Sequence, residues 1–242
     1  MSQSTPSSPL TVVLVHGAFA DSSSWAGVIE RLHAKGTKVI AAANPLRGLT
    51  SDSAYVASVI DEIPGPVLAV GHSYGGAVIS NAATGRSNVV GLVFVCAFAP
   101  DEGEVLLEVS GTSKDSVLGT ALVPHQYAID GDTLTEFTID PTKARDAFAS
   151  DLSDIQAELI GTIQRPAAAS AFTDRSGAPA WKSLPCWAVV ATSDRAAGTD
   201  LVRAHAERAG ATITEVEGSH VVMLSKPDVV TEVIESAIAK LS

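Results

Sequence analysis

Residues 71–75 read Gly71-His72-Ser73-Tyr74-Gly75, and this G-x-S-x-G stretch decides the fold. The apolar run 66–70 before it predicts a buried strand, and the small residues 75–83 after it favour a helix. A sharp turn between strand and helix would expose Ser73 as a nucleophile, with helix N–H groups aimed at developing negative charge. Because the bare motif often occurs by chance, the alternative is an ordinary glycine-rich turn.

Five further apolar runs predict core strands, at residues 10–15, 38–42, 89–97, 186–191 and 212–216. Several are apolar throughout, which is typical of strands buried on both faces of a parallel sheet. Helical segments alternate with them along the chain. The sequence therefore predicts an α/β fold, with a mostly parallel sheet of about six strands flanked by helices.

The regular alternation of predicted strands and helices stops after Pro100. Residues 101–182 hold no strong buried strand, and we expect a cap inserted into a single domain that spans residues 10–242. The alternative is a set of long loops, which are uncommon without a function. Residues 1–9 are rich in Ser and Pro and lack the features of a signal peptide, so we expect a disordered tail.

The composition and charge of the chain limit which kinds of binding partner are expected. The chain has 242 residues, a net charge of −11 and a sequence pI of about 4.9. The negative charge argues against nucleic acid or an anionic membrane as a partner, and solubility is its simplest explanation. No apolar run is long enough for a membrane span.

Cys96 and Cys186 lie in apolar runs and are expected to be free thiols, so we expect a cytoplasmic protein. No metal or cofactor is expected, and a homodimer is left open.

A serine nucleophile needs a base, and six histidines compete for that role. His220 follows the last predicted strand and is the preferred base, because partners should lie just after strands. The other five histidines are expected elsewhere. His33 and His205 should lie on helix surfaces, and His125 should lie in the cap, where it could touch substrate. His72 should lie beside the nucleophile but point away from it, and His16 should support the loop after the first strand.

Asp194 follows the strand at residues 186–191 and is the expected partner of the base. The order Ser73, Asp194, His220 is the order of this fold. Asp200 is the alternative, although opening the next helix is its favoured role. The expected oxyanion hole combines the backbone N–H of Tyr74 with that of Ala18, or with that of Phe19 as second choice.

The chain resembles the α/β-hydrolase superfamily. The resemblance rests on residues 13–19 (VLVHGAF), on the G-x-S-x-G stretch, on residues 193–195 (SDR) and on residues 218–227 (GSHVVMLSKP). Within the superfamily it is most similar to the branch of plant hydroxynitrile lyases, plant methyl esterases such as the salicylate-binding esterase, and bacterial relatives. The resemblance runs from Leu10 onward and is weakest in the cap.

The resemblance also implies which chemistry to expect. Plant lyases carry Thr or Asn where Gly17 stands, and one group has Lys directly after the catalytic His, where this chain has Val221. Both departures favour ester hydrolysis. Ser73 also excludes epoxide hydrolases and haloalkane dehalogenases, whose relatives use an Asp nucleophile.

We therefore predict a carboxylesterase-type serine hydrolase for small, largely apolar esters. Candidate substrate-pocket residues are Phe19, Phe98, Val221 and Trp181, with Ala18 and Tyr74 beside them. Core packing is a strong alternative for the aromatic residues, and structural anchoring is favoured for Trp181. Two other functions remain open: lyase or cofactor-free oxygenase chemistry with the same triad, and a ligand receptor with vestigial turnover.

Overall fold

Six parallel strands form the central sheet of the computed structural model, which describes residues 9–241. Their order is β2-β1-β3-β4-β8-β9, with bounds β1 Thr11–Val15, β2 Lys38–Ala42, β3 Val67–His72, β4 Val89–Val95, β8 Cys186–Ala191 and β9 Thr212–Val216. Every residue of β1, β3 and β8 is buried, which explains their unbroken apolar runs. The predicted α/β-hydrolase fold with about six strands is confirmed, and the sheet is wholly parallel.

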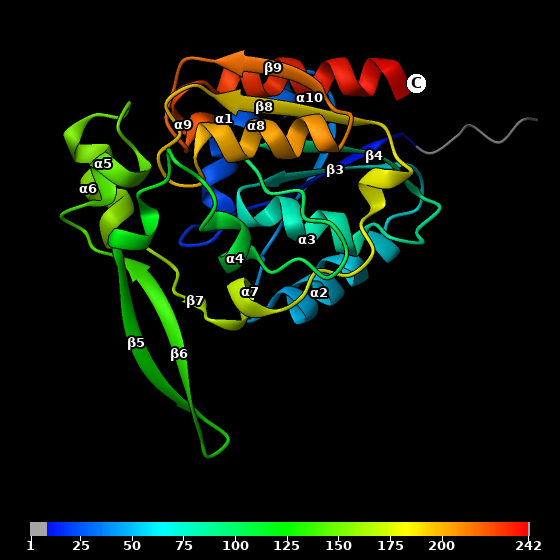
Figure 1. Ribbon diagram of the computed structural model, residues 1–242. Helices are drawn as coiled ribbons and strands as arrows, with labels where there is room; N and C mark the ends of the chain where they lie inside the picture. The colour runs from blue at the N-terminus through cyan, green and yellow to red at the C-terminus, as the bar shows by residue number, and fades with distance from the viewer. Residues whose placement is uncertain (1–8, 242) are drawn as a thin grey trace, which may run out of the picture.

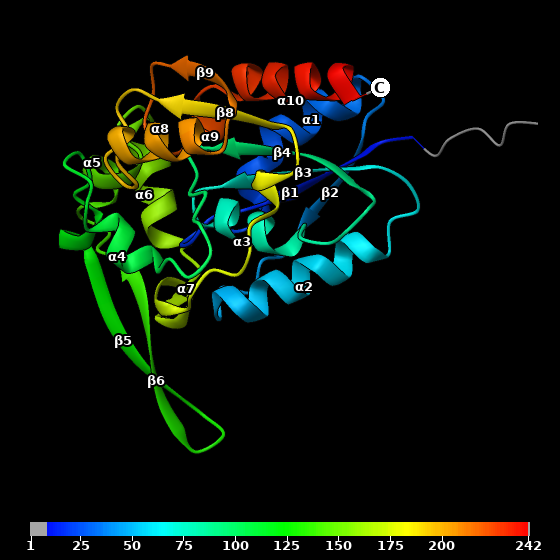
Figure 2. The same cartoon turned by 45° about the vertical axis from the view of Figure 1, so that its right-hand side comes forward.

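Helices cover both faces of this sheet (Figures 1 and 2). Helices α1 (Ala26–Ala34) and α10 (Pro227–Leu241) pack together on one face, and the short η1 (Ser22–Trp25) and α9 (Val222–Ser225) pack beside α1. Helices α2 (Leu49–Asp61), α3 (Tyr74–Ala82) and α8 (Thr199–Arg208) lie on the other face. The carboxyl ends of the parallel strands therefore meet at one edge, where α/β proteins place their sites.

The segment between β4 and β8 lies over this edge and beside it. Its elements are α4 (Leu106–Ser110), η2 (Leu118–Thr120), β5 (Leu122–Ile129), β6 (Asp132–Ile139), α5 (Ala144–Phe148), α6 (Asp154–Thr162), β7 (Ala167–Ala168), α7 (Ser170–Thr173) and η3 (Ala180–Lys182). Helix α6 begins with a capping box, in which Ser153 and Gln156 bond each other's backbone N–H groups.

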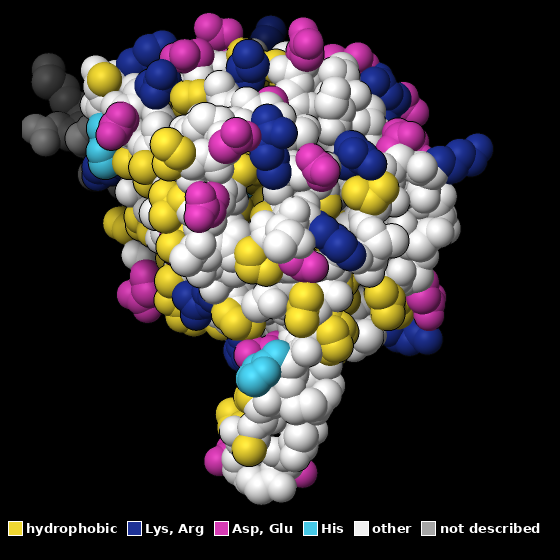
Figure 3. Space-filling view, turned by 90° about the vertical axis from the view of Figure 1, so that its left-hand side faces the viewer, with side chains coloured by type: hydrophobic (Ala, Val, Ile, Leu, Met, Phe, Trp, Pro, Cys, Tyr) yellow, Lys and Arg dark blue, Asp and Glu magenta, His cyan; other side chains and the backbone are white. Residues whose placement is uncertain are grey.

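Strands β5 and β6, in the middle of this segment, form a long hairpin. Strands β5 and β6 pair antiparallel, and the hairpin projects from the body of the protein (Figure 3). Asp130 and Gly131 join the strands with φ angles of 52° and 90°, the positive values that tight hairpin turns require. The tail expected over residues 1–9 falls almost entirely on residues 1–8, which lie outside the described residues.

Candidate active site

Ser73 occupies a sharp turn between β3 and α3, with φ 52° and ψ −122°. Few non-glycine residues adopt such a backbone conformation, and it recurs at functional sites. Two glycines let the turn form. A Cβ atom on Gly71 would lie 2.4 Å from the carbonyl oxygen of Gly75, and one on Gly75 would lie 2.4 Å from that of Val15. The helix therefore packs directly on the strands and presents Ser73 at their carboxyl end.

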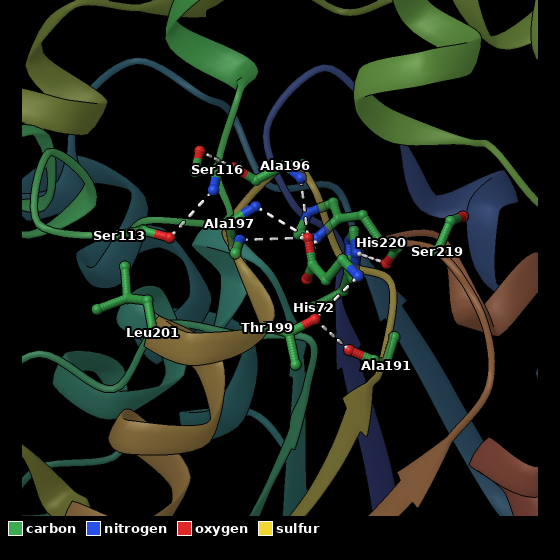
Figure 4. Close-up of polar contacts among 12 residues, drawn as sticks. His72, Ser113, Ser116, Ala191, Ala196, Ala197, Thr199, Leu201, Ser219 and His220 are labelled. Atoms are coloured by element: carbon green, nitrogen blue, oxygen red, sulfur yellow. Dashed lines mark hydrogen bonds and ion pairs between the residues drawn. The ribbon is translucent and has the colours of Figure 1, made fainter.

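His220 and Asp194 form a buried pair at the same edge of the sheet. The ring Nδ1 of His220 lies 2.8 Å from Oδ2 of Asp194, and each residue is 1% exposed. The other carboxylate oxygen accepts hydrogen bonds from the backbone N–H groups of Ala196 (2.9 Å), Ala197 (3.0 Å) and Gly198 (3.4 Å). Figure 4 shows these groups converging on the carboxylate. The carboxylate is thus fixed, and it fixes the imidazole in turn.

The structure also identifies a contact that the sequence analysis missed. Nε2 of His72 lies 3.0 Å from the carbonyl oxygen of His220, and the two ring centroids are 4.7 Å apart. Because a carbonyl only accepts, Nε2 of His72 carries the proton. Burial lowers the pKa of His72 well below its usual value, and the neighbouring His220 adds to this. His72 is therefore a neutral donor that holds the backbone of His220.

Within residues 9–241 no hydrogen bond joins the Ser73 hydroxyl to the His220 ring. In sites without substrate such catalytic bonds are often long, and they shorten in the complex. The ring contact between His72 and His220 brings the base next to the residue that precedes Ser73. The arrangement therefore leaves Nε2 of His220 available for a proton.

The two backbone N–H groups expected to form an oxyanion hole have no backbone acceptor in the described part of the chain. Among the described residues, the N–H groups of Ala18 and Tyr74 donate no backbone hydrogen bond, and both residues line the cavity above Ser73. The loop that carries Ala18 is held by His16, whose Nδ1 donates to the carbonyl of Gly17 at 2.9 Å. Burial lowers the pKa of His16, so this ring stays neutral.

The hydroxyl of Tyr74 bonds helix α2 and not a group of the candidate site. Its hydroxyl donates to Oδ2 of Asp52 at 2.7 Å, and Asp52 also accepts from the backbone N–H of Arg47 at 3.0 Å. Burial, with Asp52 beside it, raises the pKa of Tyr74 well above its usual value. Tyr74 thus anchors the turn to α2.

A cavity of about 390 Å³ lies above Ser73 and is mostly apolar. Its aromatic lining comes from both the core and the cap: Phe19, Tyr74, Phe98, Phe137, Phe148 and Phe172. Phe19 and Phe98 thus lie where the sequence predicted. Val221 does not line this cavity and instead lines a second one, described below. Trp181 lines neither cavity, and its Nε1 donates to the carbonyl of Pro100 at 3.0 Å, a contact suited to the anchoring role that the sequence favoured over substrate contact.

The remaining candidates lie outside the site. The expectation that His205 lies on the surface is wrong: it is 4% exposed, and its Nδ1 accepts the backbone N–H of Ala99 at 2.9 Å. His33 is exposed, and His125 is exposed on the projecting hairpin. Asp200 accepts from Ser113 and from the backbone of Lys114 in the first turn of α8, so the structure pairs Asp194, and not Asp200, with His220.

The sequence of residues 12–233 matches the model of the alpha/beta hydrolase family. The chain belongs to this family. The match confirms the resemblance found in the sequence, and the family is one of hydrolase-type enzymes. A comparison with curated protein sequences found no match.

Solved structures of the same fold include an esterase, a methylesterase and a methylketone synthase. Polyneuridine aldehyde esterase superposes with a TM-score of 0.80 at 20% identity, covering 95% of this chain and 99% of that one. The methylesterase MES16 from Arabidopsis gives 0.79 at 18% identity, covering 96% and 100%. Tomato methylketone synthase I, solved with 2-tridecanone, gives 0.78 at 22% identity, covering 97% and 99%. At these identities the likeness concerns the fold.

A membrane span requires a helix that is both long and apolar. Across residues 9–241, none combines the length and the apolar character needed to cross a bilayer.

Proposed function

We propose that this protein is a carboxylesterase-type serine hydrolase for small, largely apolar esters, with Ser73 as nucleophile, His220 as base and Asp194 as its partner. One observation carries the proposal: the buried pair of His220 and Asp194, 2.8 Å apart, lies at the strand edge where Ser73 opens into an apolar cavity. Esterase and methylesterase names among the structures of the same fold support it.

The mechanism follows from the atoms at this edge. Oγ of Ser73 attacks the ester carbonyl carbon while Nε2 of His220 takes its proton, and Asp194 stabilises the imidazolium. The backbone N–H groups of Ala18 and Tyr74 bind the oxyanion. The imidazolium then protonates the leaving alcohol as the C–O bond breaks. A water deprotonated by His220 hydrolyses the acyl-enzyme, releasing the acid and restoring Ser73.

Crowding around Gly17 argues against lyase chemistry. A Cβ atom on Gly17 would lie 2.8 Å from Cβ of Ser73 and 2.9 Å from Nδ1 of His72. The Thr or Asn that the resemblance assigns to lyases at this position would therefore displace the nucleophile. Without such a side chain, no donor from position 17 can hold the hydroxyl of a cyanohydrin, and ester hydrolysis remains the favoured reaction.

The cavity supports an uncharged substrate. Among the described residues that line it, none is Lys, Arg, Asp or Glu, and aromatic and aliphatic side chains dominate. A charged acyl group would lose its hydration there without gaining a partner. Cys96 and Cys186 are buried free thiols, which supports the cytoplasmic location that we also propose.

Turnover of p-nitrophenyl esters of increasing acyl length tests this function. We expect turnover of short acyl esters in the natural protein, and a loss of about 10⁶-fold in Ser73→Ala, as removal of a triad serine causes elsewhere. Activity retained in Ser73→Ala would refute covalent catalysis. Stoichiometric labelling without turnover would instead indicate a ligand receptor.

A further inference from the structure

Two apolar cavities meet at a pair of aromatic rings. The first is the cavity of about 390 Å³ above Ser73, and the second, of about 250 Å³, lies between α6 and the residues after His220. Phe19 and Phe148 line both cavities. Their rings meet edge to face, with centroids 6.4 Å apart and an interplanar angle of 76°. This pair is therefore the partition between the two spaces, and we call the second space the outer chamber.

The outer chamber lies beside His220, through the next residue in the chain and through the ring of Phe148. Val221, the next residue after His220, lines the chamber, and the Phe148 ring centroid lies 4.9 Å from that of the His220 imidazole. In acyl transfer the imidazolium protonates the leaving alcohol, so the alcohol must lie beside this ring. The outer chamber is thus on the leaving-group side of the reaction.

The lining of the outer chamber suits an alkyl chain. Its apolar residues beyond the partition are Ala20, Leu152, Leu159, Ile160, Ile163, Val221, Met223 and Leu224. Asp21 is the only ionisable residue among the described residues that line it, and no cation is present there to pair with a carboxylate. The chamber therefore favours a neutral hydrocarbon chain over a fatty acid.

The chamber also opens to the surface through exposed apolar side chains. Leu159 and Ile163 line it and are 54% and 52% exposed. Figure 3 shows hydrophobic side chains gathered on the face that carries the cap. A chain bound in the chamber would remove this apolar surface from water, which is favourable in proportion to the area covered.

We propose that the outer chamber is a subsite for the distal alkyl part of the leaving alcohol, and that Phe148 sets how long this alcohol can be. The proposal rests on the proposed ester hydrolysis. Phe148 is the last residue of the five-residue helix α5 and is 3% exposed, so its ring fills the space through which an alcohol would pass from His220 into the chamber. A rotation of this ring joins the two cavities.

The test uses two series of esters. The alcohol series is ethyl, butyl, hexyl and octyl acetate, followed by acid release, and the acyl series is the p-nitrophenyl esters from acetate to octanoate. Phe148→Ala should raise the ratio of kcat/KM for octyl acetate to that for ethyl acetate by about tenfold or more, a size typical of added methylene contacts in an apolar pocket. Phe148 is one of many residues that line the cavity above Ser73, so the ratio of octanoate to acetate in the acyl series should change by clearly less than the alcohol ratio. Using ratios removes any general effect of the contact between Phe148 and His220.

Two further variants locate the effect. Ile160→Trp, which fills the chamber, should cancel the gain when combined with Phe148→Ala, and Ile163→Trp serves if the first does not fold. Ile155→Ala is the matched control, because Ile155 lies on the same helix, is 80% exposed and lines neither cavity. It should leave both series unchanged.

The outcomes separate this proposal from the proposed function. If Phe148→Ala, or Phe148→Leu where the alanine variant does not fold, hydrolyses short esters with an unchanged alcohol ratio, the subsite is refuted and ester hydrolysis stands. A shift in the acyl series instead would assign the chamber to the acyl chain and overturn the proposal. If the natural protein hydrolyses neither series, the proposed function fails and the subsite with it.

Discussion

Replacing Asp194 by Asn separates the electrostatic role of this carboxylate from its structural role. One carboxylate oxygen accepts three backbone N–H groups, from Ala196, Ala197 and Gly198, and the other faces Nδ1 of His220. An Asn side chain can keep its oxygen toward the backbone donors. Its NH₂ group then faces His220, so Nδ1 of the imidazole must accept and Nε2 must hold the proton. The fold survives, while the imidazole becomes the wrong tautomer for a base.

The expected loss is large. The same exchange in serine proteases lowers kcat by about 10⁴-fold, which corresponds to about 5 kcal/mol of transition-state stabilisation. We expect Asp194→Asn to show a loss of this order in kcat on p-nitrophenyl acetate, with KM changed little. Circular dichroism and the melting temperature should show that the loss does not come from unfolding.

Asp200→Asn is the matched control. Asp200 lies six residues along the chain and makes comparable bonds, to Ser113 and the backbone of Lys114, yet it does not contact His220. We expect its activity to stay within about threefold of the natural protein, because a lost surface hydrogen bond acts on stability and not on the base. The reasoning is refuted if Asp194→Asn keeps more than about a tenth of the activity, or if Asp200→Asn loses as much.

Three further predictions concern other parts of the structure. Gly17→Thr should lower esterase kcat/KM by about 10²-fold or more, because its Cβ would collide with Ser73 and His72, and no cyanohydrin cleavage should appear; a near-normal rate would contradict the crowding. Burial of its ring lowers the pKa of His205 from 6.5 to about 4, so the unfolded state binds more protons between these values and stability falls as the pH falls. When the pH is lowered from about 7 to about 5, the free energy of unfolding measured in urea should therefore fall by about 2 kcal/mol less in His205→Gln than in the natural protein. Equal falls in the two proteins would refute this. Trp181→Phe removes the bond to Pro100 and part of a buried ring and should lower the melting temperature by at least about 2–4 °C while KM across the acyl series stays the same; altered KM values would indicate that Trp181 contacts the substrate.

The sheet and the positions of the site residues could be predicted because they depend on local sequence. A strand buried on both faces must be apolar throughout, so runs such as Cys186–Ala191 mark their own bounds. Close packing of α3 on the sheet requires Gly71 and Gly75, so the turn at Ser73 is visible in the motif. His220 and Asp194 follow strands whose ends must meet at one edge.

What the sequence could not predict depends on partners far away in the chain. His205 lies in a helix that is polar on average, and nothing nearby shows that the backbone N–H of Ala99 needs an acceptor there. The sequence favoured an anchoring role for Trp181 but could not show its partner, a carbonyl 81 residues away that accepts the buried indole N–H. His72 holds the backbone of His220, a contact 148 residues apart in sequence, and only its place inside the motif could have suggested it.

The contacts of the cap were the hardest to predict from the sequence, because they join segments that lie far apart in the chain. Phe19 from the core stacks on Phe172 at 6.1 Å and meets Phe148 edge to face, so three segments supply one aromatic wall. Each ring taken alone has the pattern of an ordinary core residue, and only their packing makes a partition between two cavities. The reacting groups, by contrast, lie at or just after strand ends, where rigid elements hold them to the tolerance that catalysis demands. Substitutions in the cap should therefore change which ester fits before they change how the ester bond is broken.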